Sequence, residues 1–445
     1  MTANLPNKIN QYNVSCFRFL QSDFYASSVK HNDITPYLMF EGVVPDFNEA
    51  DKLICLARGI DNMNVNVYGI KDQDTGKTDY IAVNDFWKVY TFNATNLTTF
   101  GPVTAKVPSS EKHDTGEFAF LNFLSSAHPL PESDSPSHVT FLSSVSLDPF
   151  VKSTISLVRL KSVHDRHLIA RWSVDKVPYM HSFSVTKKYA IFFASPFYVN
   201  VLKMIKSAKP FASLDWLPDE PTTVYVIEIS TGKVTTLKTD TMFCMHHVNA
   251  FEADDGRIVV DVSSYPSPEF VSDLQIEILM NRTRRNAFDP HALLKRYVID
   301  MSAGEITLQH FEPSIHVPYS VNLDMPAINE NYRYKDYCYV YGIVLKHDNI
   351  SLSSIALVKK NLCGNTTEDA SWKLNGHYPV EPWFVPTPNA KHEDDGILMV
   401  PVINGNNATS YIAILDAKTM HMVNWSYLPT ILPYSLHGRF FTEID

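Results

Sequence analysis

The sequence predicts an all-β chain whose sheets close into one propeller domain spanning residues 1–445. Short β-branched and aromatic runs recur along the 445 residues, separated by Gly, Asp, Asn and Pro. The 27 prolines and the scarcity of long stretches with helical periodicity favour strands over helices. At this length a closed ring of sheets suits the pattern better than a sandwich. No repeat or linker marks a boundary between domains.

Individual strands are predicted where apolar runs lie between turn residues, at 189–193, 223–227, 258–262, 338–341 and 397–402. The turns are rich in Ser, Asp and Gly, which adopt the tight backbone conformations that hairpins need. One helix is predicted over 268–280, where Phe270, Leu274 and Ile278 recur every four residues. The polar stretch 131–138 is predicted to be a long surface loop.

The charge balance argues against a nucleic-acid partner. Formal net charge is −10 at pH 7, whereas phosphate binding needs clustered Lys and Arg. The one basic cluster, residues 282–285, is short and is interpreted as a solvated surface turn. We therefore expect no nucleic acid among the partners.

Cysteine usage and the N-terminal residues predict a cytoplasmic protein. The five cysteines are odd in number, widely spaced and without a Cys-x-x-Cys pair, so no disulfide framework or structural zinc site is expected and a reducing compartment fits. Several Asn-x-Ser/Thr sequons occur, for example at Asn93, Asn96, Asn365 and Asn407, but they matter only in a secreted protein. Residues 1–12 are polar and do not resemble a signal peptide, and no apolar run reaches the length of a membrane span.

Four histidines stand in short apolar or aromatic segments scattered along the chain: His128, His181, His246 and His437. A buried imidazole is costly without a partner, and imidazole is the commonest nitrogen ligand for a transition metal. Any one of them alone is more often a hydrogen-bonded core residue than a ligand. A closed scaffold of many strands can nevertheless bring one ligand from each of several distant segments to one metal.

The segments around these histidines occur in a specific order. Residues 178–186 read Pro-Tyr-Met-His-Ser-Phe-Ser-Val-Thr, 245–252 read Met-His-His-Val-Asn-Ala-Phe-Glu, 381–386 read Glu-Pro-Trp-Phe-Val-Pro, 393–396 read Glu-Asp-Asp-Gly, and 436–440 read Leu-His-Gly-Arg-Phe. In this order, from about Phe17 to the C-terminus, they resemble the carotenoid cleavage oxygenases. The animal branch, with the β-carotene oxygenases and the retinal-pigment-epithelium isomerohydrolase, is the most similar.

The resemblance implies a seven-bladed β-propeller with one Fe(II) per chain on its axis, held by the four histidines. The chain starts late relative to the family, so the propeller is expected to be incomplete at its N-terminus. Asp85, Asp324 and Glu381 stand where the family has carboxylates that orient three of the ligands. Two of these are aspartates in place of glutamates, which shortens the arm by about 1.5 Å. The histidine hydrogen bond then requires a backbone adjustment or a bridging water.

Three aromatic residues beside the matched segments, Tyr179, Phe243 and Tyr265, are candidates for the wall of a substrate tunnel. Their π faces would stabilise cationic character along a polyene. Core packing is the commoner role for any single aromatic residue. The apolar segment 197–216, with its flanking lysines, is a candidate for peripheral membrane contact, and a buried strand and helix turn explains it equally well.

The function implied by the resemblance is Fe(II)-dependent cleavage of a carotenoid double bond by O₂, which gives retinal or apocarotenal products. No protein nucleophile or general acid is required. A retinoid isomerohydrolase would use the same metal as a Lewis acid on an ester. A carotenoid- or lipid-binding propeller without activity is the alternative from another class, and the two aspartates and the short N-terminus favour it.

Overall fold

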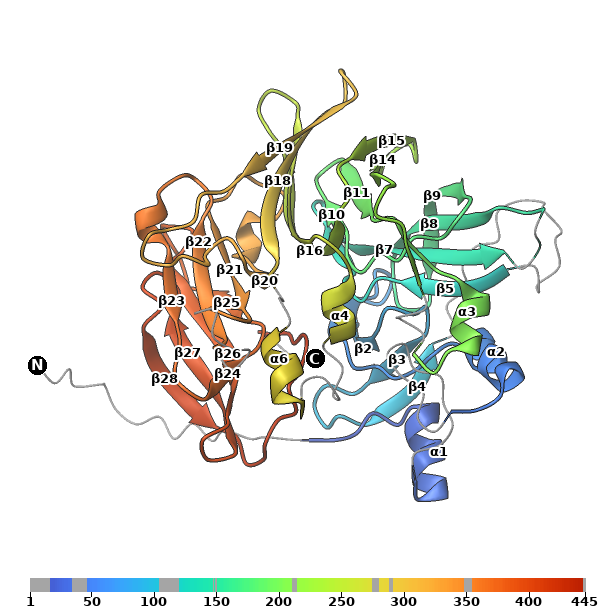
Figure 1. Ribbon diagram of the computed structural model, residues 1–445, viewed down its shortest axis with the longest axis horizontal. Helices are drawn as coiled ribbons and strands as arrows, with labels where there is room; N and C mark the ends of the chain where they lie inside the picture. Colours follow the sequence, from blue (N-terminus) through green and yellow to red (C-terminus); the bar gives the residue numbers. More distant parts are fainter. Residues whose placement is uncertain are drawn as a thin grey trace, which may run out of the picture.

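The strands of the chain form antiparallel sheets that follow one another in sequence order around the molecule (Figure 1). The computed structural model describes residues 17–33, 46–103, 120–146, 148, 150–209, 214–273, 280–287, 291–347 and 354–442. Within these residues lie six sheets of four or five strands and one two-stranded ribbon. This arrangement is a β-propeller, as the sequence predicts, with six blades among the described residues where the resemblance implies seven.

The first three blades come from the N-terminal half of the chain. Blade one contains β1 (Asn66–Lys71), β2 (Thr78–Val83), β3 (Val89–Phe92) and β4 (Thr99–Val103). Blade two contains β5 (Phe120–Ser125), β6 (Leu130–Glu132), β7 (Ser135–Ser146), β8 (Ser153–Leu160) and β9 (Arg166–Val174). Blade three contains β10 (Ser184–Val185), β11 (Tyr189–Ala194), β14 (Thr222–Glu228) and β15 (Val234–Thr239), with the ribbon β12 (Phe197–Tyr198) and β13 (Asp215–Trp216) inserted.

The last three blades come from the C-terminal half. Blade four contains β16 (Phe243–Glu252), β17 (Ile258–Tyr265), β18 (Leu293–Asp300) and β19 (Glu305–His310). Blade five contains β20 (Asp324–Ala327), β21 (Tyr339–Val344), β22 (Ala356–Asn361) and β23 (Ala370–Trp372). Blade six contains β24 (His377–Pro379), β25 (Trp383–Pro386), β26 (Gly396–Asn404), β27 (Thr409–Asp416) and β28 (Met422–Tyr427). All five strands predicted from the sequence fall within these blades.

The hydrophobic core lies between neighbouring blades. One cluster joins Val226 of blade three to Val260 of blade four, and another joins Val340 of blade five to Leu294 of blade four. A third joins Leu357 of blade five to Leu398 of blade six. Both faces of a middle strand are therefore covered, and β17 is buried along its whole length. This packing explains why the middle strands read as nearly continuous apolar runs in the sequence.

The helices are few and short: α1 (Asp23–His31), α2 (Glu49–Arg58), α3 (Val201–Lys206), α4 (Glu269–Asp273) and α6 (Arg282–Ala287), with 3₁₀ turns η2 (Glu330–Tyr332) and η3 (Thr366–Glu368). The helix predicted over 268–280 begins as α4, and residues 274–279 lie outside the described residues. The basic cluster 282–285 was predicted to be a turn and is instead the first part of α6. It is largely exposed to solvent, as expected.

The prediction of a long loop over 131–138 is wrong, because these residues form a β-hairpin. Strands β6 and β7 pair here, with Leu130 opposite Val139. One polar side chain is held firmly within the sheet: Glu132 accepts hydrogen bonds from Ser137 Oγ at 2.6 Å and from both Arg159 Nε and Nη2 at 2.6 and 2.7 Å. Arg159 lies on β8, so the partner that makes a polar strand stable here is far away in the sequence.

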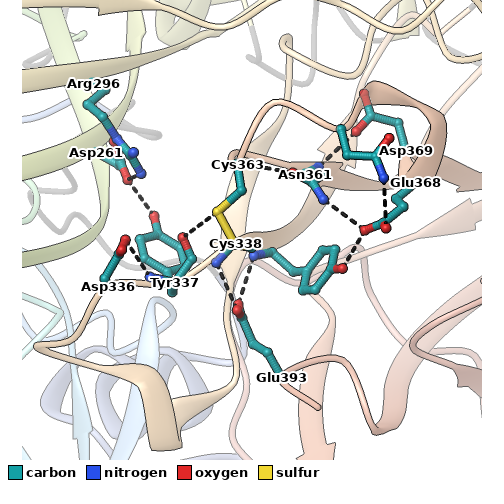
Figure 2. The surroundings of a disulfide bond; sticks show 12 residues. Asp261, Arg296, Asp336, Tyr337, Cys338, Asn361, Cys363, Glu368, Asp369 and Glu393 are labelled. Atoms are coloured by element: carbon teal, nitrogen blue, oxygen red, sulfur yellow. Dashed lines mark hydrogen bonds and ion pairs between the residues drawn. A yellow bond between two sulfur atoms is a disulfide. The ribbon is translucent and has the colours of Figure 1, made fainter.

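The expectation of no disulfide is also wrong for one pair of cysteines. Cys338 precedes β21 and Cys363 follows β22, so their bond joins the ends of two adjacent antiparallel strands in blade five (Figure 2). Glu393, in the turn before β26, accepts hydrogen bonds from the backbone N–H groups of Cys338 and Tyr339 at 2.8 and 2.7 Å. The disulfide therefore sits where blade five is held to blade six.

Removing this disulfide should lower the free energy of unfolding. The two cysteines are 25 residues apart. A cross-link that closes a loop of that length lowers the conformational entropy of the unfolded chain, which stabilises the folded state by about 3.5 kcal/mol. We expect the double variant Cys338→Ser, Cys363→Ser to lose stability of that order in urea unfolding. A reducing agent should destabilise the parent and leave the double variant unchanged; equal stability of parent and variant would contradict the prediction.

Candidate metal centre

Four distant segments place a histidine at the centre of the propeller. His128 lies in the turn between β5 and β6, His181 just before β10, His246 within β16, and His437 in the C-terminal segment after β28. One ligand nitrogen from each lies within 4.8 Å of the others. The His128 and His181 Nε2 atoms are 3.0 Å apart, and those of His246 and His437 are 3.3 Å apart.

In three of these rings the other nitrogen, Nδ1, donates its N–H to a carboxylate. His181 Nδ1 lies 3.1 Å from Asp85 Oδ2, and His246 Nδ1 lies 2.7 Å from Asp324 Oδ1. In the third pair, His437 Nδ1 lies 2.9 Å from Glu381 Oε1. A carboxylate that accepts from Nδ1–H leaves the lone pair on Nε2 of a neutral ring. The three carboxylates thus aim three lone pairs at one point.

Both aspartates reach their histidines directly, without an intervening water. The backbone around Asp324 and His246 is irregular: β20 has a shifted register after Asp324, Met325 has a positive φ of 53°, and β16 is irregular on both sides of His246. Such bulges re-aim individual side chains in a sheet. The contact between Asp324 and His246 is thus direct and lies in a part of the sheet with an irregular backbone.

Two of the three aromatic candidates donate hydrogen bonds to these carboxylates. Tyr179 Oη donates to Asp85 Oδ2 at 2.8 Å, and Tyr265 Oη donates to Asp324 Oδ2 at 2.6 Å. Phe243 stacks on the Tyr179 ring with centroids 6.2 Å apart. All three side chains are buried in one hydrophobic cluster. The hydroxyl groups, which the sequence argument did not use, hold the carboxylates in place.

Burial and neighbouring charges shift the pKa values of His128, His246 and His437. Burial lowers the pKa of His128 well below its ordinary value, and the neighbouring imidazoles of His437 and His181 add to the effect. Burial also lowers the pKa of His246, although Asp324 opposes it. For His437 burial acts in the same direction, but the charge and hydrogen bond of Glu381 outweigh it and raise the pKa. His128 and His246 are thus neutral near pH 7, as metal ligands must be.

The arrangement fits a transition metal. Two ligands about 2.1 Å from a metal and at right angles lie about 3.0 Å apart, which is close to the two Nε2 separations measured here. Without a cation, lone pairs that converge this closely repel one another. His128 has no carboxylate partner; its backbone N–H is held by Ser126 Oγ at 2.9 Å, and the same hydroxyl donates to the His181 carbonyl at 3.1 Å. Ser126 was not among the sequence candidates.

Two cavities in the described part of the chain reach the histidines. One, of about 80 Å³, touches His128 and His246 and is lined by polar side chains that include Asn249, Glu330 and Arg439. The other, of about 170 Å³, touches His437 and is lined largely by apolar side chains: Val380, Met399, Ile412, Leu436 and Phe440. Tyr179, Phe243 and Tyr265 line neither cavity.

The C-terminal segment joins the last blade to the first. The Arg439 guanidinium lies 3.9 Å from the ring centroid of Tyr68 on β1 and 5.0 Å from that of Trp383 on β25. Phe441 meets Tyr80 of β2 edge-on, with centroids 5.2 Å apart. This clamp fixes the segment that carries His437.

The segment considered for membrane contact is partly buried and partly exposed. Phe197, Met204 and Ile205 are buried, whereas Leu202 on α3 is 69% exposed. Residues 210–213 lie outside the described residues. Among the helices of the described chain, none is long and apolar enough to cross a membrane.

A ring of antiparallel blades with four histidines meeting at its centre defines a metal-binding β-propeller. The family model described as RPE65, retinal pigment epithelial membrane protein, matches residues 9–442. The chain therefore belongs to the RPE65 and carotenoid cleavage oxygenase family.

Individual relatives are distant. Human β,β-carotene 15,15'-dioxygenase is 26% identical over 60% of this chain and 53% of its own length. The carotenoid cleavage dioxygenase 8 homolog A of rice (Oryza sativa subsp. japonica) is 28% identical over 73% of this chain and 58% of its own length. The chain thus spans little more than half of these curated relatives. Among solved structures, cobalt-substituted Synechocystis ACO superposes with a TM-score of 0.75 at 22% identity, covering 94% of this chain and 82% of that one.

Proposed function

We propose that this chain is an Fe(II)-dependent oxygenase that cleaves a double bond of a carotenoid-like polyene with O₂ to give aldehyde products, retinal or an apocarotenal. The observation that carries the proposal is the convergence of four imidazole Nε2 atoms, three of them fixed by carboxylates. The printed names of the relatives, a β,β-carotene dioxygenase and a carotenoid cleavage dioxygenase, support a carotenoid substrate class.

The donor set suits one Fe(II) per chain, held by His128, His181, His246 and His437. Neutral imidazoles bind Fe(II) well, and four of them leave coordination positions open for small molecules. Iron bound there would supply the binding and activation of O₂ that cleavage of a double bond needs. Imidazole ligands also suit zinc, so our choice of iron rests on the oxygenase names of the relatives together with the four-histidine donor set.

The roles of the protein's own residues follow from their contacts. Asp85, Asp324 and Glu381 hold three ligand rings in one tautomer and one orientation. Tyr179 and Tyr265 fix two of these carboxylates and cover them with apolar rings that exclude water. No side chain at the centre is placed as a nucleophile, so the chain contributes positioning and a dry environment rather than a covalent step.

We propose that the substrate approaches through apolar surroundings and that O₂ or water uses the polar cavity. Tyr179, Phe243 and Tyr265 remain our candidates for the wall of the polyene path, because Tyr179 lies beside His181, Phe243 stacks on Tyr179, and Tyr265 contacts the carboxylate that binds His246. Their π faces favour positive charge. The apolar cavity beside His437 supports access by a nonpolar chain. The polar cavity of about 80 Å³ has room for O₂ or water beside His128 and His246.

Segment 197–216 is our candidate for peripheral contact with a lipid surface, from which a carotenoid would be drawn. Exposed Leu202 stands next to Lys203 at the start of α3. An apolar side chain flanked by cations suits the boundary between headgroups and acyl chains.

The deciding experiment is product analysis under ¹⁸O₂. Fe(II)-loaded protein is incubated with β-carotene in detergent micelles, and the products are identified by mass spectrometry. We expect aldehydes that carry label from ¹⁸O₂, and no such products when oxygen is excluded. In a parallel incubation with a retinyl ester, release of a retinol without oxygen consumption would replace the proposal with an isomerohydrolase. Polyene bound without turnover would replace it with a binding protein.

A further inference from the structure

The turn that carries the disulfide also carries an N-glycosylation sequon. Asn365-Thr366-Thr367 begins two residues after Cys363 and leads into η3. Asn365 is exposed, and Thr367 Oγ1 donates a hydrogen bond to Asn365 Oδ1 at 2.6 Å. Asparagine and the threonine hydroxyl, the two groups that define a sequon, thus face each other at the surface.

Two further sequons lie on exposed turns; the threonine hydroxyl contacts the asparagine in the first, and only the threonine backbone N–H does so in the second. Between β26 and β27, Thr409 Oγ1 donates to the side-chain oxygen of Asn407 at 2.6 Å. Between β3 and β4, the backbone N–H of Thr98 donates to Asn96 Oδ1 at 2.9 Å. Both asparagines are exposed. Because a glycan is bulky and hydrated, it is tolerated only where the asparagine leaves a turn toward solvent, as all three do here.

The disulfide and the exposed sequons point to the same compartment. Cytosolic thiols are kept reduced, whereas disulfides form and persist in the endoplasmic reticulum and outside the cell. Attachment of glycans to Asn-x-Ser/Thr occurs in that same secretory pathway. Cys338 and Cys363 are joined across strand ends that Glu393 and Asn361 also hold through backbone N–H groups, so the bond is part of the folded blade (Figure 2).

We propose that this chain folds in the oxidising lumen of the secretory pathway, where Cys338 and Cys363 form a disulfide and Asn96, Asn365 and Asn407 receive N-linked glycans. This departs from the cytoplasmic location expected above. The absence of a signal peptide was inferred from residues 1–12, which lie outside the described residues. The proposal is independent of the oxygenase reaction, because none of these five residues contributes to the metal centre.

The secretory pathway supplies the co-reactants that both modifications need, an electron acceptor for the thiols and a sugar donor for the asparagines. The two thiols lose two electrons and two protons to a protein disulfide oxidoreductase when the S–S bond forms. At each asparagine, Nδ2 loses a proton and bonds to the anomeric carbon of a sugar, while the sugar–diphosphate bond of a lipid-linked donor breaks. A glycosylated amide keeps one N–H. The hydrogen bond from Asn365 Nδ2 to Glu368 Oε1, 2.9 Å long, can therefore remain.

The test uses the full chain isolated from the cells that make it. Thiols are blocked with iodoacetamide before any reduction, and peptide N-glycosidase treatment in H₂¹⁸O marks each former glycan site as a labelled aspartate. We expect a fall in mass, label at positions 96, 365 and 407, and a linked peptide pair containing Cys338 and Cys363. An unchanged mass, label only at other positions, or alkylation of both cysteines before reduction would overturn the proposal.

A variant pair isolates the site beside the disulfide. Thr367→Val removes the hydroxyl that the sequon requires while keeping the side-chain shape, and Thr367→Ser keeps the hydroxyl. Made in the same cells, the valine variant should carry one glycan fewer than the parent and the serine variant the same number. Asn365→Gln should match the valine variant, which guards against a folding defect in either one. Equal glycan numbers in all of these proteins would rule out Asn365 as an acceptor.

Discussion

His181→Ala and His246→Ala should each abolish stoichiometric iron binding and with it any oxygen-dependent activity. The parent is expected to hold close to one iron per chain, because four Nε2 atoms lie within 4.8 Å. Each variant removes one of the four donors and also leaves Asp85 or Asp324 buried without its histidine. The carboxylate keeps its hydrogen bond from Tyr179 or Tyr265 but loses the one from the histidine, which costs about 1.5–3 kcal/mol, or it takes up a proton. Either response disturbs the remaining ligands.

The measurement is iron content after anaerobic Fe(II) loading and desalting, with circular dichroism to verify that each variant is folded. His392→Ala is the matched control, since His392 is an exposed histidine in the turn before β26 and should leave the iron content unchanged. A folded parent that holds no iron would remove the basis of the oxygenase proposal. Full iron content in either variant would remove that histidine from the ligand set.

The fold class was predictable because strand patterns are local. Apolar runs bounded by turn residues, such as those that form β11 and β17, need only their own residues to be recognised. The prediction of a loop at 131–138 failed for the opposite reason. Glu132 is stabilised in a strand by Arg159 on the next strand, and a polar run in the sequence does not reveal such a partner. Likewise, the pairing of Cys338 with Cys363 depends on two strand ends meeting, not on cysteine spacing.

The prediction of the candidate site depended on the order of several motifs along the chain rather than on single residue types. Nothing local links His128 to His437, which come together only when the ring of blades forms. The resemblance supplied that long-range information and also named the three carboxylates. It did not distinguish a ring that lines a tunnel from a hydroxyl that holds a carboxylate, as at Tyr179 and Tyr265, because both roles place a tyrosine beside a ligand.

The motif at 393–396 shows a further limit. It helped to place the chain in its family, yet its side chains build the scaffold rather than the metal centre. Glu393 accepts hydrogen bonds from two backbone N–H groups of blade five. The buried Asp394 carboxylate lies 2.7 Å from Lys359 Nζ on β22. A signature motif can therefore mark the contact between two blades, and its presence alone does not indicate chemistry.

Asp324→Ala should weaken Fe(II) binding by about 10–100-fold, the usual effect of removing a carboxylate that orients a metal-bound histidine. His246 loses the 2.7 Å hydrogen bond that fixes its tautomer, so its Nε2 lone pair is no longer held toward the other three. Affinity is measured by competition with a chelator of known strength. Tyr265→Phe is the control, since it removes the other hydrogen bond to Asp324 and keeps the carboxylate–histidine contact.

The two variants separate orientation from packing. If Asp324 acts by holding His246, Tyr265→Phe should retain most of the affinity and Asp324→Ala should not. Asp324→Asn keeps an oxygen that can accept from His246 Nδ1 but removes the negative charge, so its affinity should lie between those of the parent and the alanine variant. Parent-like affinity in Asp324→Ala would mean that the aspartate no longer serves the metal. The aspartate at position 324 would then favour the alternative in which the propeller binds polyenes without cleaving them.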